Sequence, residues 1–528
     1  MVASCAGFSP LPPEGCVSVC EIDGKVAHKP FESANPAEFT NTVVTHPVIS
    51  LSHDAVHLAA REDARHVFLH VEEKLLKRII STWYEQGTVE ALELAATPND
   101  QSGYILQMSA RIALKAIHAM SLVLNSVYPH FGERGQHLTA SGAHSRSLHH
   151  NPVRCIAWHP HITKIAVAVS DDSVRVYTAM SPGLVPTLRS KGQRSVSCLA
   201  WRPHSASELA VGCHAGVLVW QVDPKSVVTR PSISCATVLK QPGHSPVSSV
   251  QWNSTGTLLV SAATGDTSMY IWDVDLQESI PLRRVGGGGI SLVSWSPDVH
   301  KLLAATTSVT FRVWDSSNWV PERWRVLSGH VRTACWSPCS TVLLFTTSEE
   351  SVVYALQFKP NCAQLDTMFY SDTPVSEQAA RVVINLAQEE VGNGTRIGGT
   401  VLSMVWDRLG RHLALIFENS PLVAIYRTDL VPHLLITPNC LVKGASGEQP
   451  TTIAFQNNFD VGACLTIAWS SGRIQYFPIV YQELKNPNQS VRHNASMQYR
   501  PDQSFLETSM APDASSFMHS FQDSFLSY

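Results

Sequence analysis

The residues of this 528-residue chain best equipped for chemistry are its 23 histidines and 12 cysteines, and their spacing decides what they could do. His149-His150 and Cys335/Cys339 carry ligand-type side chains, but no second pair stands at the spacing of a metal site. Gly392-Asn393-Gly394 lacks the strand before and the helix after that a phosphate-binding loop needs. The catalytic patterns G-x-S-x-G and H-E-x-x-H do not occur in the sequence. We therefore expect no enzyme, no metal and no cofactor.

One set of polar residues has a spacing with a structural use. His244 follows a glycine, and Asp266 lies six residues before Trp272. In this pattern the carboxylate of a tight turn hydrogen-bonds the histidine, which in turn reaches the tryptophan, and a satisfied buried network of this kind rigidifies a fold. Parts of the pattern recur elsewhere, and partner-binding residues stay unassigned. The predicted structural residues are His244, Asp266, Trp272, Asp171 and His330.

The elements that must position this set are short strands. Within 242–273, small polar residues alternate with apolar ones over 247–252, and two apolar runs follow at 258–262 and 269–272. Turn residues separate the three runs, as in antiparallel hairpins. A Gly-His start and a Trp-Asp end are the marks of a WD repeat, which folds as one four-stranded propeller blade. A single blade cannot bury both of its faces, so this one predicts several more.

Seven pairs of aromatic residues continue the pattern, each pair marking the first and third strands of a blade. Successive first aromatics lie 41 to 51 residues apart, except for one gap of 70. This period is the WD type and predicts a mainly β, seven-bladed β-propeller over 152–484. The long gap predicts an insertion at 359–399, which we expect to be a flexible surface loop. The pairs are Trp158/Tyr177, Trp201/Trp220, Trp252/Trp272, Trp295/Trp314, Trp336/Tyr354, Trp406/Tyr426 and Phe455/Tyr476.

The segments that flank the propeller have other patterns. Residues 1–59 are rich in proline and predict an extended arm, either mobile or supplying a strand that closes the ring. Residues 60–131 have a helical period, and the helix expected at 103–126 is apolar almost all round, which indicates burial by neighbours. Residues 132–151 predict a linker. Residues 485–528, polar with widely spaced phenylalanines, predict a disordered tail.

Charge and hydropathy restrict the classes of partner that we expect the chain to bind. The chain has 39 basic and 43 acidic residues and a net charge of −4, whereas nucleic-acid binding needs a basic surplus or stripe, so we expect no direct nucleic-acid contact. The most apolar long segment, 104–128, contains Arg111, Lys115 and His118. We expect a buried helix there, not a membrane span, and membrane contact only through a partner. Cysteines scattered among strand-like runs predict free thiols in a reducing compartment.

Several local strings are more specific than the repeat itself, and together they resemble the aladin family of WD-repeat nucleoporins. The resemblance implies a component of the nuclear pore complex at the nuclear envelope of the nucleus. It implies an integral pore-membrane nucleoporin as anchor, other nucleoporins as partners, support of nuclear protein import and a mitotic role at spindle poles. The strings are IAWHPH (156–161), DDSVRVY (171–177), LAWRPHSASELAV (199–211), TRPSISCATVLKQPGHSPV (229–247), TFRVWDSSNWVPERW (310–324), SMVWD (403–407) and WSSGRI (469–474).

Three functions compete for this pattern. The first is a non-enzymatic scaffold or adaptor of the nuclear pore complex, in which the propeller is the docking platform. The second is a WD-repeat adaptor of another assembly, such as a ubiquitin-ligase substrate receptor or a coat component. The third is a hydrolase carried on a propeller, which would need convergent histidines and carboxylates, or a nucleophile with a paired base, at the central funnel.

Overall fold

The structure is a computed structural model of the 528-residue chain. The chain divides into two compact units, residues 1–53 with 151–528, and residues 54–150. Apart from Asn151, the predicted linker 132–151 lies outside the described residues, as does the predicted tail 485–528. The described residues are 2–13, 15–22, 24–34, 49–51, 92, 95–96, 107–116, 119, 151–178, 185–223, 228–283, 288–358, 380–391, 395–431 and 433–481.

Seven antiparallel sheets, the blades, make up most of the first unit. Blade one consists of β4 (Val153–Trp158), β5 (Lys164–Val169), β6 (Val174–Thr178) and β7 (Thr187–Leu188). Blade two consists of β8 (Cys198–Trp201), β9 (Glu208–Cys213), β10 (Gly216–Gln221) and β11 (Ala236–Leu239), with the 3₁₀ turn η3 (Ile233–Cys235) before the last strand. Blade three consists of β12 (Val247–Trp252), β13 (Leu258–Ala263), β14 (Met269–Asp273) and β15 (Glu278–Leu282).

The remaining blades repeat the arrangement, and the last one differs at its outer edge. Blade four consists of β16 (Ile290–Trp295), β17 (Lys301–Thr306), β18 (Thr310–Asp315) and β19 (Pro321–Arg325). Blade five consists of β20 (Val331–Trp336), β21 (Val342–Thr347), β22 (Val352–Gln357) and β23 (Arg381–Asn385). Blade six consists of β26 (Val401–Trp406), β27 (His412–Phe417), β28 (Leu422–Asp429) and β29 (Leu435–Lys443). Blade seven has three strands of its own, β30 (Pro450–Gln456), β31 (Gly462–Trp469) and β32 (Arg473–Val480).

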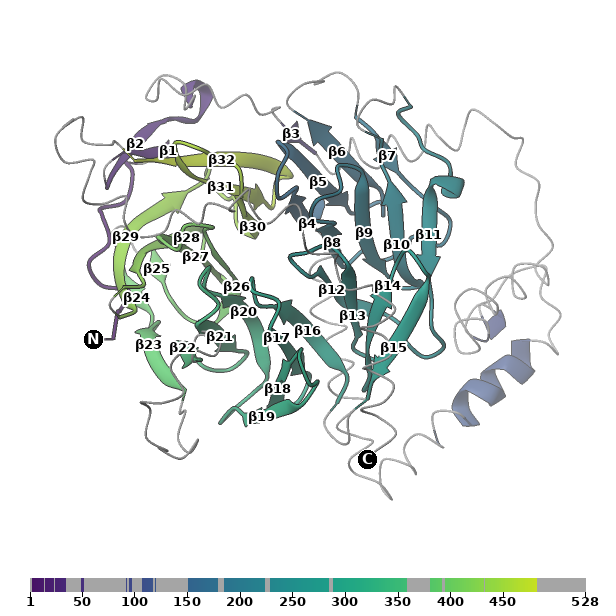
Figure 1. Ribbon diagram of the computed structural model, residues 1–528. Helices are drawn as coiled ribbons and strands as arrows, with labels where there is room; N and C mark the ends of the chain where they lie inside the picture. The colour runs from purple at the N-terminus through teal and green to yellow at the C-terminus, as the bar shows by residue number, and fades with distance from the viewer. Residues whose placement is uncertain are drawn as a thin grey trace, which may run out of the picture. The chain divides into compact units, whose positions relative to one another are not determined.

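The blades form a closed ring around a common centre (Figure 1). The first strand of each blade lies innermost, and these strands contact one another in order from β4 round to β30, which contacts β4 again. Because neighbouring strands in a blade are antiparallel, the loops from first to second and from third to fourth strand share one side of the ring. We call this side face I. Face II carries the loops from second to third strand and from one blade to the next.

The hydrophobic core lies between successive blades. In β9, for example, Leu209 and Val211 pack towards blade one, whereas Ala210, which points the other way, packs towards blade three. A strand buried on both faces requires a continuous apolar run instead of strict alternation, and this explains the sequence of β9. The predicted seven-bladed β-propeller is confirmed.

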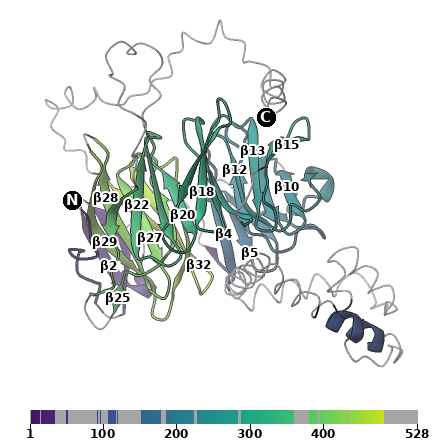
Figure 2. The same cartoon turned by 90° about the horizontal axis from the view of Figure 1, so that it is seen from below.

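The N-terminal arm supplies the outer part of blade seven. Strand β1 (Cys16–Ile22) pairs in parallel with β32, and β2 (Lys25–Pro30) pairs with β1 and is followed by the 3₁₀ turn η1 (Phe31–Ser33). Farther along, β3 (Ile49–Ser50) pairs with the start of β32 in the antiparallel sense. The two views show β2 beside blades six and seven (Figure 1, Figure 2). Both ends of the ring therefore meet in one sheet.

The first residues of the arm also join blades five and six. Ala3 forms a parallel bridge with Ile384 of β23, and its neighbour Cys5 is buried 3.8 Å from the hydroxyl of Tyr426 in β28. The ring of Phe8 packs edge-on against Tyr426 with centroids 5.0 Å apart. Since Ala3, Cys5 and Tyr426 belong to one buried cluster, this stretch of the arm is part of the core.

The predicted insertion at 359–399 is wrong for its second half. Residues Arg381–Asn385 form β23, the fourth strand of blade five, and a small two-stranded sheet follows, β24 (Glu389–Glu390) with β25 (Arg396–Ile397). Ile384 is fully buried because β23 must cover the outer edge of β22. Residues 359–379 lie outside the described part of the chain, and so does Gly392-Asn393-Gly394.

The second unit is described only in part. Residues 92, 95–96, 107–116 and 119 are helical, and within 107–116 the side chains of Met108 and Ile112 are 47% and 59% exposed in this chain. Burial of this helix, against the propeller or against another protein, therefore stays a prediction. Among the described residues, no helix has both the length and the apolar composition that crossing a membrane requires.

Candidate functional site

Blade three contains the polar network that the sequence predicts, with one additional member. His244 Nδ1 lies 3.4 Å from Asp266 Oδ2, and His244 Nε2 lies 2.8 Å from Ser261 Oγ. Trp272 Nε1 donates to the same Ser261 oxygen at 2.8 Å. The histidine therefore reaches the tryptophan through the serine and not directly, which corrects the expected direct contact. Burial lowers the pKa of His244, although Asp266 opposes the shift, so the network holds a neutral imidazole.

Asp171 and His330, the other two predicted residues, make only parts of this network. Asp171 Oδ1 accepts from the backbone N–H and the hydroxyl of Ser173, as Asp266 accepts from the N–H of Ser268. His330 Nδ1 lies 3.2 Å from Ser348 Oγ, the position that corresponds to Asp266. Both residues thus fasten a tight turn on face II. All five predicted residues have structural contacts.

Two further residues do the work of His244 in other blades, and the sequence analysis missed both. Gln193 of blade two accepts from Trp220 Nε1 at 2.9 Å and donates to the carbonyl of Asp172 in blade one at 2.7 Å. Glu448 of blade seven pairs with Arg473 at 2.6 Å. Each stands directly after a glycine, as His244 does. The signal was therefore a Gly-polar dipeptide before the first strand, of which Gly-His is one form.

Tryptophans at the ends of the first strands connect neighbouring blades. The indole N–H of Trp201 donates to Ala157 O of blade one at 3.1 Å, and that of Trp336 donates to Ser294 O of blade four at 3.0 Å. Trp158 Nε1 donates to Thr466 Oγ1 of blade seven at 2.9 Å. This last bond joins the first blade to the last, so the same residue type that marks the repeat also closes the ring.

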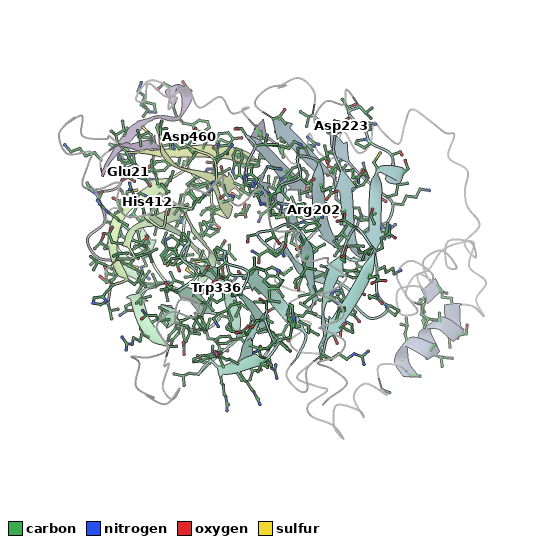
Figure 3. All side chains as sticks on the ribbon, in the orientation of Figure 1. Glu21, Arg202, Asp223, Trp336, His412 and Asp460 are labelled. Atoms are coloured by element: carbon green, nitrogen blue, oxygen red, sulfur yellow. The ribbon has the colours of Figure 1, made fainter. Side chains whose placement is uncertain are left out.

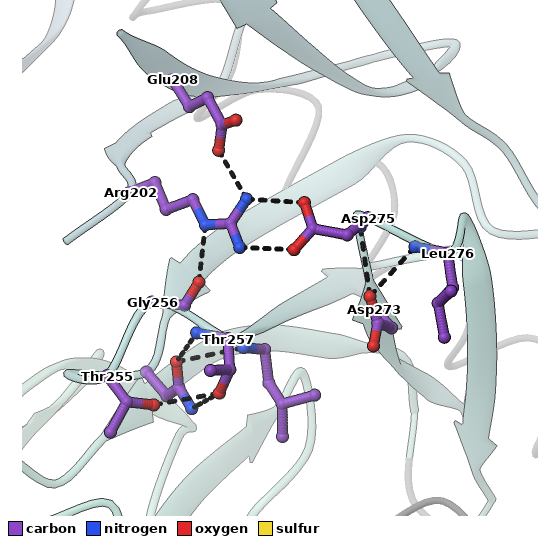
Figure 4. Close-up of polar contacts among 10 residues, drawn as sticks. Arg202, Glu208, Thr255, Gly256, Thr257, Asp273, Asp275 and Leu276 are labelled. Carbon is purple, nitrogen blue, oxygen red and sulfur yellow. Dashed lines mark hydrogen bonds and ion pairs between the residues drawn. The ribbon is translucent and has the colours of Figure 1, made fainter. Parts of the chain in front are cut away.

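A cluster centred on Arg202 stabilises face I where blades two and three meet (Figure 4). Its guanidinium donates to both carboxylate oxygens of Asp275 at 2.9 and 2.8 Å, to Glu208 at 2.7 Å and to the carbonyl of Gly256 at 2.6 Å. The hydrogen bond from Arg202 holds the pKa of Asp275 below its ordinary value. A bidentate arginine pair of this kind fixes geometry as well as charge.

Lys164 makes the corresponding contact between blades one and two. The side chain is buried at 2% exposure, its Nζ donates to Ala206 O at 3.0 Å, and it lies 4.9 Å from the centroid of the Trp201 ring. Burial lowers the pKa of this amine to about 8. The interaction links the loops of two blades, and the amine of Lys164 is engaged in contacts within the fold.

A polar seam joins the arm to blades six and seven. The buried carboxylate of Glu21 accepts two hydrogen bonds of 2.9 Å from the side-chain amide of Asn439. Nearby, His412 Nδ1 lies 2.9 Å from the hydroxyl of Tyr481, and Figure 3 shows Glu21 and His412 on the same side of the ring. Burial lowers the pKa of His412 to about 4, with contributions from Arg427 and Arg411. The seam therefore places hydrogen-bonded polar side chains of the arm and of blade six at the closure of the ring.

The exposed large apolar side chains are distributed unequally between the two faces. Among the described loops, face II exposes Leu327. Face I exposes apolar side chains on six blades, and exposed apolar surface of this kind marks sites of protein contact. Those in or beside its loops are Ile162, Val228, Ile233, Leu276, Val320, Leu409, Val431, Leu435 and Val461.

In the described residues, no group of three or more histidines, cysteines, aspartates or glutamates has the geometry to hold a metal ion. The predicted free cysteines agree with the eleven thiols found in the same part of the chain. Burial raises the pKa of several of them, including Cys155 and Cys335. These thiols pack as small apolar groups.

Seven radial sheets with a His-Ser-Trp network and a turn aspartate in blade three define a WD-type β-propeller. The match to known families is specific, because residues 134–480, more than half of the chain, fit the family model described as the Aladin seven-bladed propeller. The chain belongs to the aladin seven-bladed propeller family.

The chain is also similar to individual proteins. Over 355 residues the chain is 27% identical to Aladin of Arabidopsis thaliana, covering 62% of this chain and 76% of the relative. Over 201 residues it is 27% identical to nuclear distribution protein PAC1 of Arthroderma otae, covering 36% of this chain and 42% of that protein. The crystal structure of the Cps50 (Swd1) beta-propeller domain of Myceliophteria thermophila is 14% identical, with a TM-score of 0.47 over 62% of this chain and 96% of that one.

Proposed function

We propose that the chain is a non-enzymatic scaffold of the nuclear pore complex that supports nucleocytoplasmic transport of proteins. The observation that carries this proposal is the family match over 134–480, which includes β4 to β32 and therefore all strands of the ring except those that the arm supplies. In this proposal the protein resides at the nuclear envelope, where an integral pore-membrane nucleoporin anchors it and other nucleoporins bind it. A role at spindle poles in mitosis belongs to the same proposal.

The use of polar residues within the ring supports a binding role over a catalytic one. His244, Asp266 and Glu448, which have the right chemistry for acid–base work, are each engaged in contacts that fasten the ring. The exposed apolar residues of face I offer surface for protein contact. The proposed function therefore requires no catalytic activity of the chain. In this proposal the protein contacts the membrane and its cargo through partners.

Imaging combined with cross-linking tests the proposal. The fluorescently tagged full-length chain should mark the nuclear rim, and cross-linking mass spectrometry should recover nucleoporins. Trp272→Ala removes a buried aromatic, which should cost about 3–5 kcal/mol of ring stability and abolish the rim signal. The exposed Ser254→Ala serves as control and should keep it. Cross-links dominated by ubiquitin-ligase or coat subunits, with no rim staining, would contradict the proposal and favour the second class of adaptor.

A further inference from the structure

Face I carries exposed apolar residues on three consecutive blades, six, seven and one. We call this group the apolar arc: Ile162, Leu409, Val431, Leu435 and Val461, with exposed fractions of 39, 58, 71, 45 and 37%. Hydrogen bonds hold the loops that carry it together. Arg408 Nη1 donates to Asn457 O at 3.4 Å, and Asn458 Nδ2 donates to Thr163 Oγ1 at 3.1 Å. These hydrogen bonds therefore link loops of all three blades that carry the arc.

The charges around the arc are unequal. Arg408, Arg411 and Arg427 are exposed in or beside its loops, against the exposed carboxylates of Asp429 and Asp460. A ligand with acidic and apolar side chains matches such a surface, because charge complementarity guides the encounter and apolar burial supplies the affinity.

The chain itself leaves the ring inside this arc. Strand β32 ends at Val480, and the next residue, Tyr481, donates its backbone N–H to the carbonyl of Val461 at 3.2 Å. The guanidinium of Arg411 lies 4.9 Å from the centroid of the Tyr481 ring. Tyr481, the last described residue, therefore contacts both the apolar residue Val461 and the basic residue Arg411.

The sequence of that segment has the matching chemistry. Residues 501–528 contain four acidic side chains and neither lysine nor arginine. Phe517, Phe521 and Phe525 follow one another at intervals of four, a spacing that puts them on one side of a helix. Amphipathic helices dock apolar grooves with anchors at this spacing. The acidic residues are Asp502, Glu507, Asp513 and Asp523.

We propose that residues 513–528 fold back in the same molecule and dock Phe517, Phe521 and Phe525 onto the apolar arc. The stretch from Tyr481 to Phe517 has a typical end-to-end distance of roughly 30–36 Å as a flexible chain, which lets it return to the ring. Tethering also raises the local concentration of the segment to the order of millimolar, so a weak contact is sufficient. The docked segment covers apolar surface and competes with any partner that binds face I at these blades.

Hydrogen exchange on the full-length protein tests this directly. Phe517→Ser, Phe521→Ser and Phe525→Ser are combined in one chain, and peptides covering 407–411 and 457–463 are followed by mass spectrometry. These loops should exchange at least about threefold faster than in the wild type, whereas 326–330 on face II should not change. The matched control combines Ser516→Ala, Ser520→Ala and Ser524→Ala, which precede the three phenylalanines at the same spacing, and it should exchange as the wild type does.

The reciprocal variant guards against indirect effects. Leu409→Asp changes an exposed residue, so the ring should fold, while exchange within 513–528 should become faster. Equal exchange of the arc loops in the wild type and the triple phenylalanine variant would overturn the proposal. Protection that rises with protein concentration would also overturn it, because a second copy would then supply the segment. Neither outcome depends on the nuclear pore, so this test and that of the proposed function can fail separately.

Discussion

The indole N–H of the third-strand tryptophan is satisfied differently from blade to blade. Trp272 donates to Ser261, and Trp220 donates to Gln193. In blade four the buried N–H of Trp314 has no partner in the described part of the chain. The register explains the difference, because Ala304 occupies in blade four the position that Ser261 occupies in blade three. The presence or absence of one hydroxyl group on the second strand therefore determines whether the indole N–H of Trp272 or Trp314 is hydrogen-bonded there.

Ser261→Ala should lower the free energy of unfolding of the ring by about 2–6 kcal/mol. The change leaves both His244 Nε2 and Trp272 Nε1 buried without their shared partner, and each such loss costs about 1–3 kcal/mol. Urea unfolding followed by tryptophan fluorescence measures the effect. The exposed Ser254→Ala is the control and should stay within about 0.5 kcal/mol of the wild type.

The complementary change is Ala304→Ser in blade four. A hydroxyl there would give Trp314 Nε1 an acceptor and should raise stability by about 0.5–1.5 kcal/mol. If Ser261→Ala were as stable as the wild type while Ala304→Ser gave no gain, the serine would have no role in the network.

At the scale of elements, the closure of blade seven depends on short strands from the arm. Leu51, directly after β3, donates its backbone N–H to Gly472 O at 2.9 Å. Gly472 has φ +85°, and a Cβ at this position would collide with the carbonyl oxygen of Leu51. The close approach of two backbones at this turn therefore requires glycine.

Gly472→Ala should destabilise the ring by more than the cost of its backbone conformation alone. Gly447, at φ +80° with open space around it, provides the matched control for that conformational cost, which is about 1–2 kcal/mol. Gly472→Ala should cost roughly 1–3 kcal/mol more because of the collision and should release β3. Thermal unfolding of both variants gives the difference, and hydrogen exchange at 49–51 reports β3. Equal stability of the two variants would show that the contact with Leu51 contributes nothing.

The strands with regular aromatic spacing were predictable, whereas those without it were not. The Trp252/Trp272 pair lies in β12 and β14 as expected, because the repeat fixes where an aromatic ends a strand. Strand β23 was missed because a fourth strand has no marker residue, and its sequence follows a long unmarked stretch. Gln193 was missed because an amide can replace the imidazole only if the structure brings it to Trp220. That pairing joins a residue before the first strand of blade two to one in its third strand, so local spacing does not reveal it.

At the scale of the whole molecule, buried neutral histidines make ring stability dependent on pH. His412 has a pKa of about 4 in the folded protein, below the value of roughly 6.5 for an unfolded chain. Between these values the unfolded state binds a proton that the folded state does not, so stability is complete above pH 6.5 and falls as the pH decreases towards 4. Burial lowers the pKa of His159 and His244 in the same direction.

The stability of the wild-type ring should therefore decrease by several kcal/mol between pH 7 and pH 4, with about 3 kcal/mol from His412 alone. His412→Asn should make the slope of stability against pH shallower, even if it lowers stability at pH 7. Urea unfolding at a series of pH values measures this slope. His300→Asn, at an exposed position, is the control and should leave the slope unchanged. An identical slope in all three proteins would rule out His412 as a contributor.

Because the arm closes the ring, its first strand must wait for a partner strand that the ribosome makes much later. Gln475 donates its side-chain amide to the carbonyl of Ser18 at 2.7 Å across 457 residues of sequence. At about 5–20 residues per second, the first strand emerges roughly 20–90 s before its partner has been made. During this interval β1 can pair with β2 but lacks β32, so a nascent chain of this protein should need a chaperone at its N-terminal end until the last blade is complete.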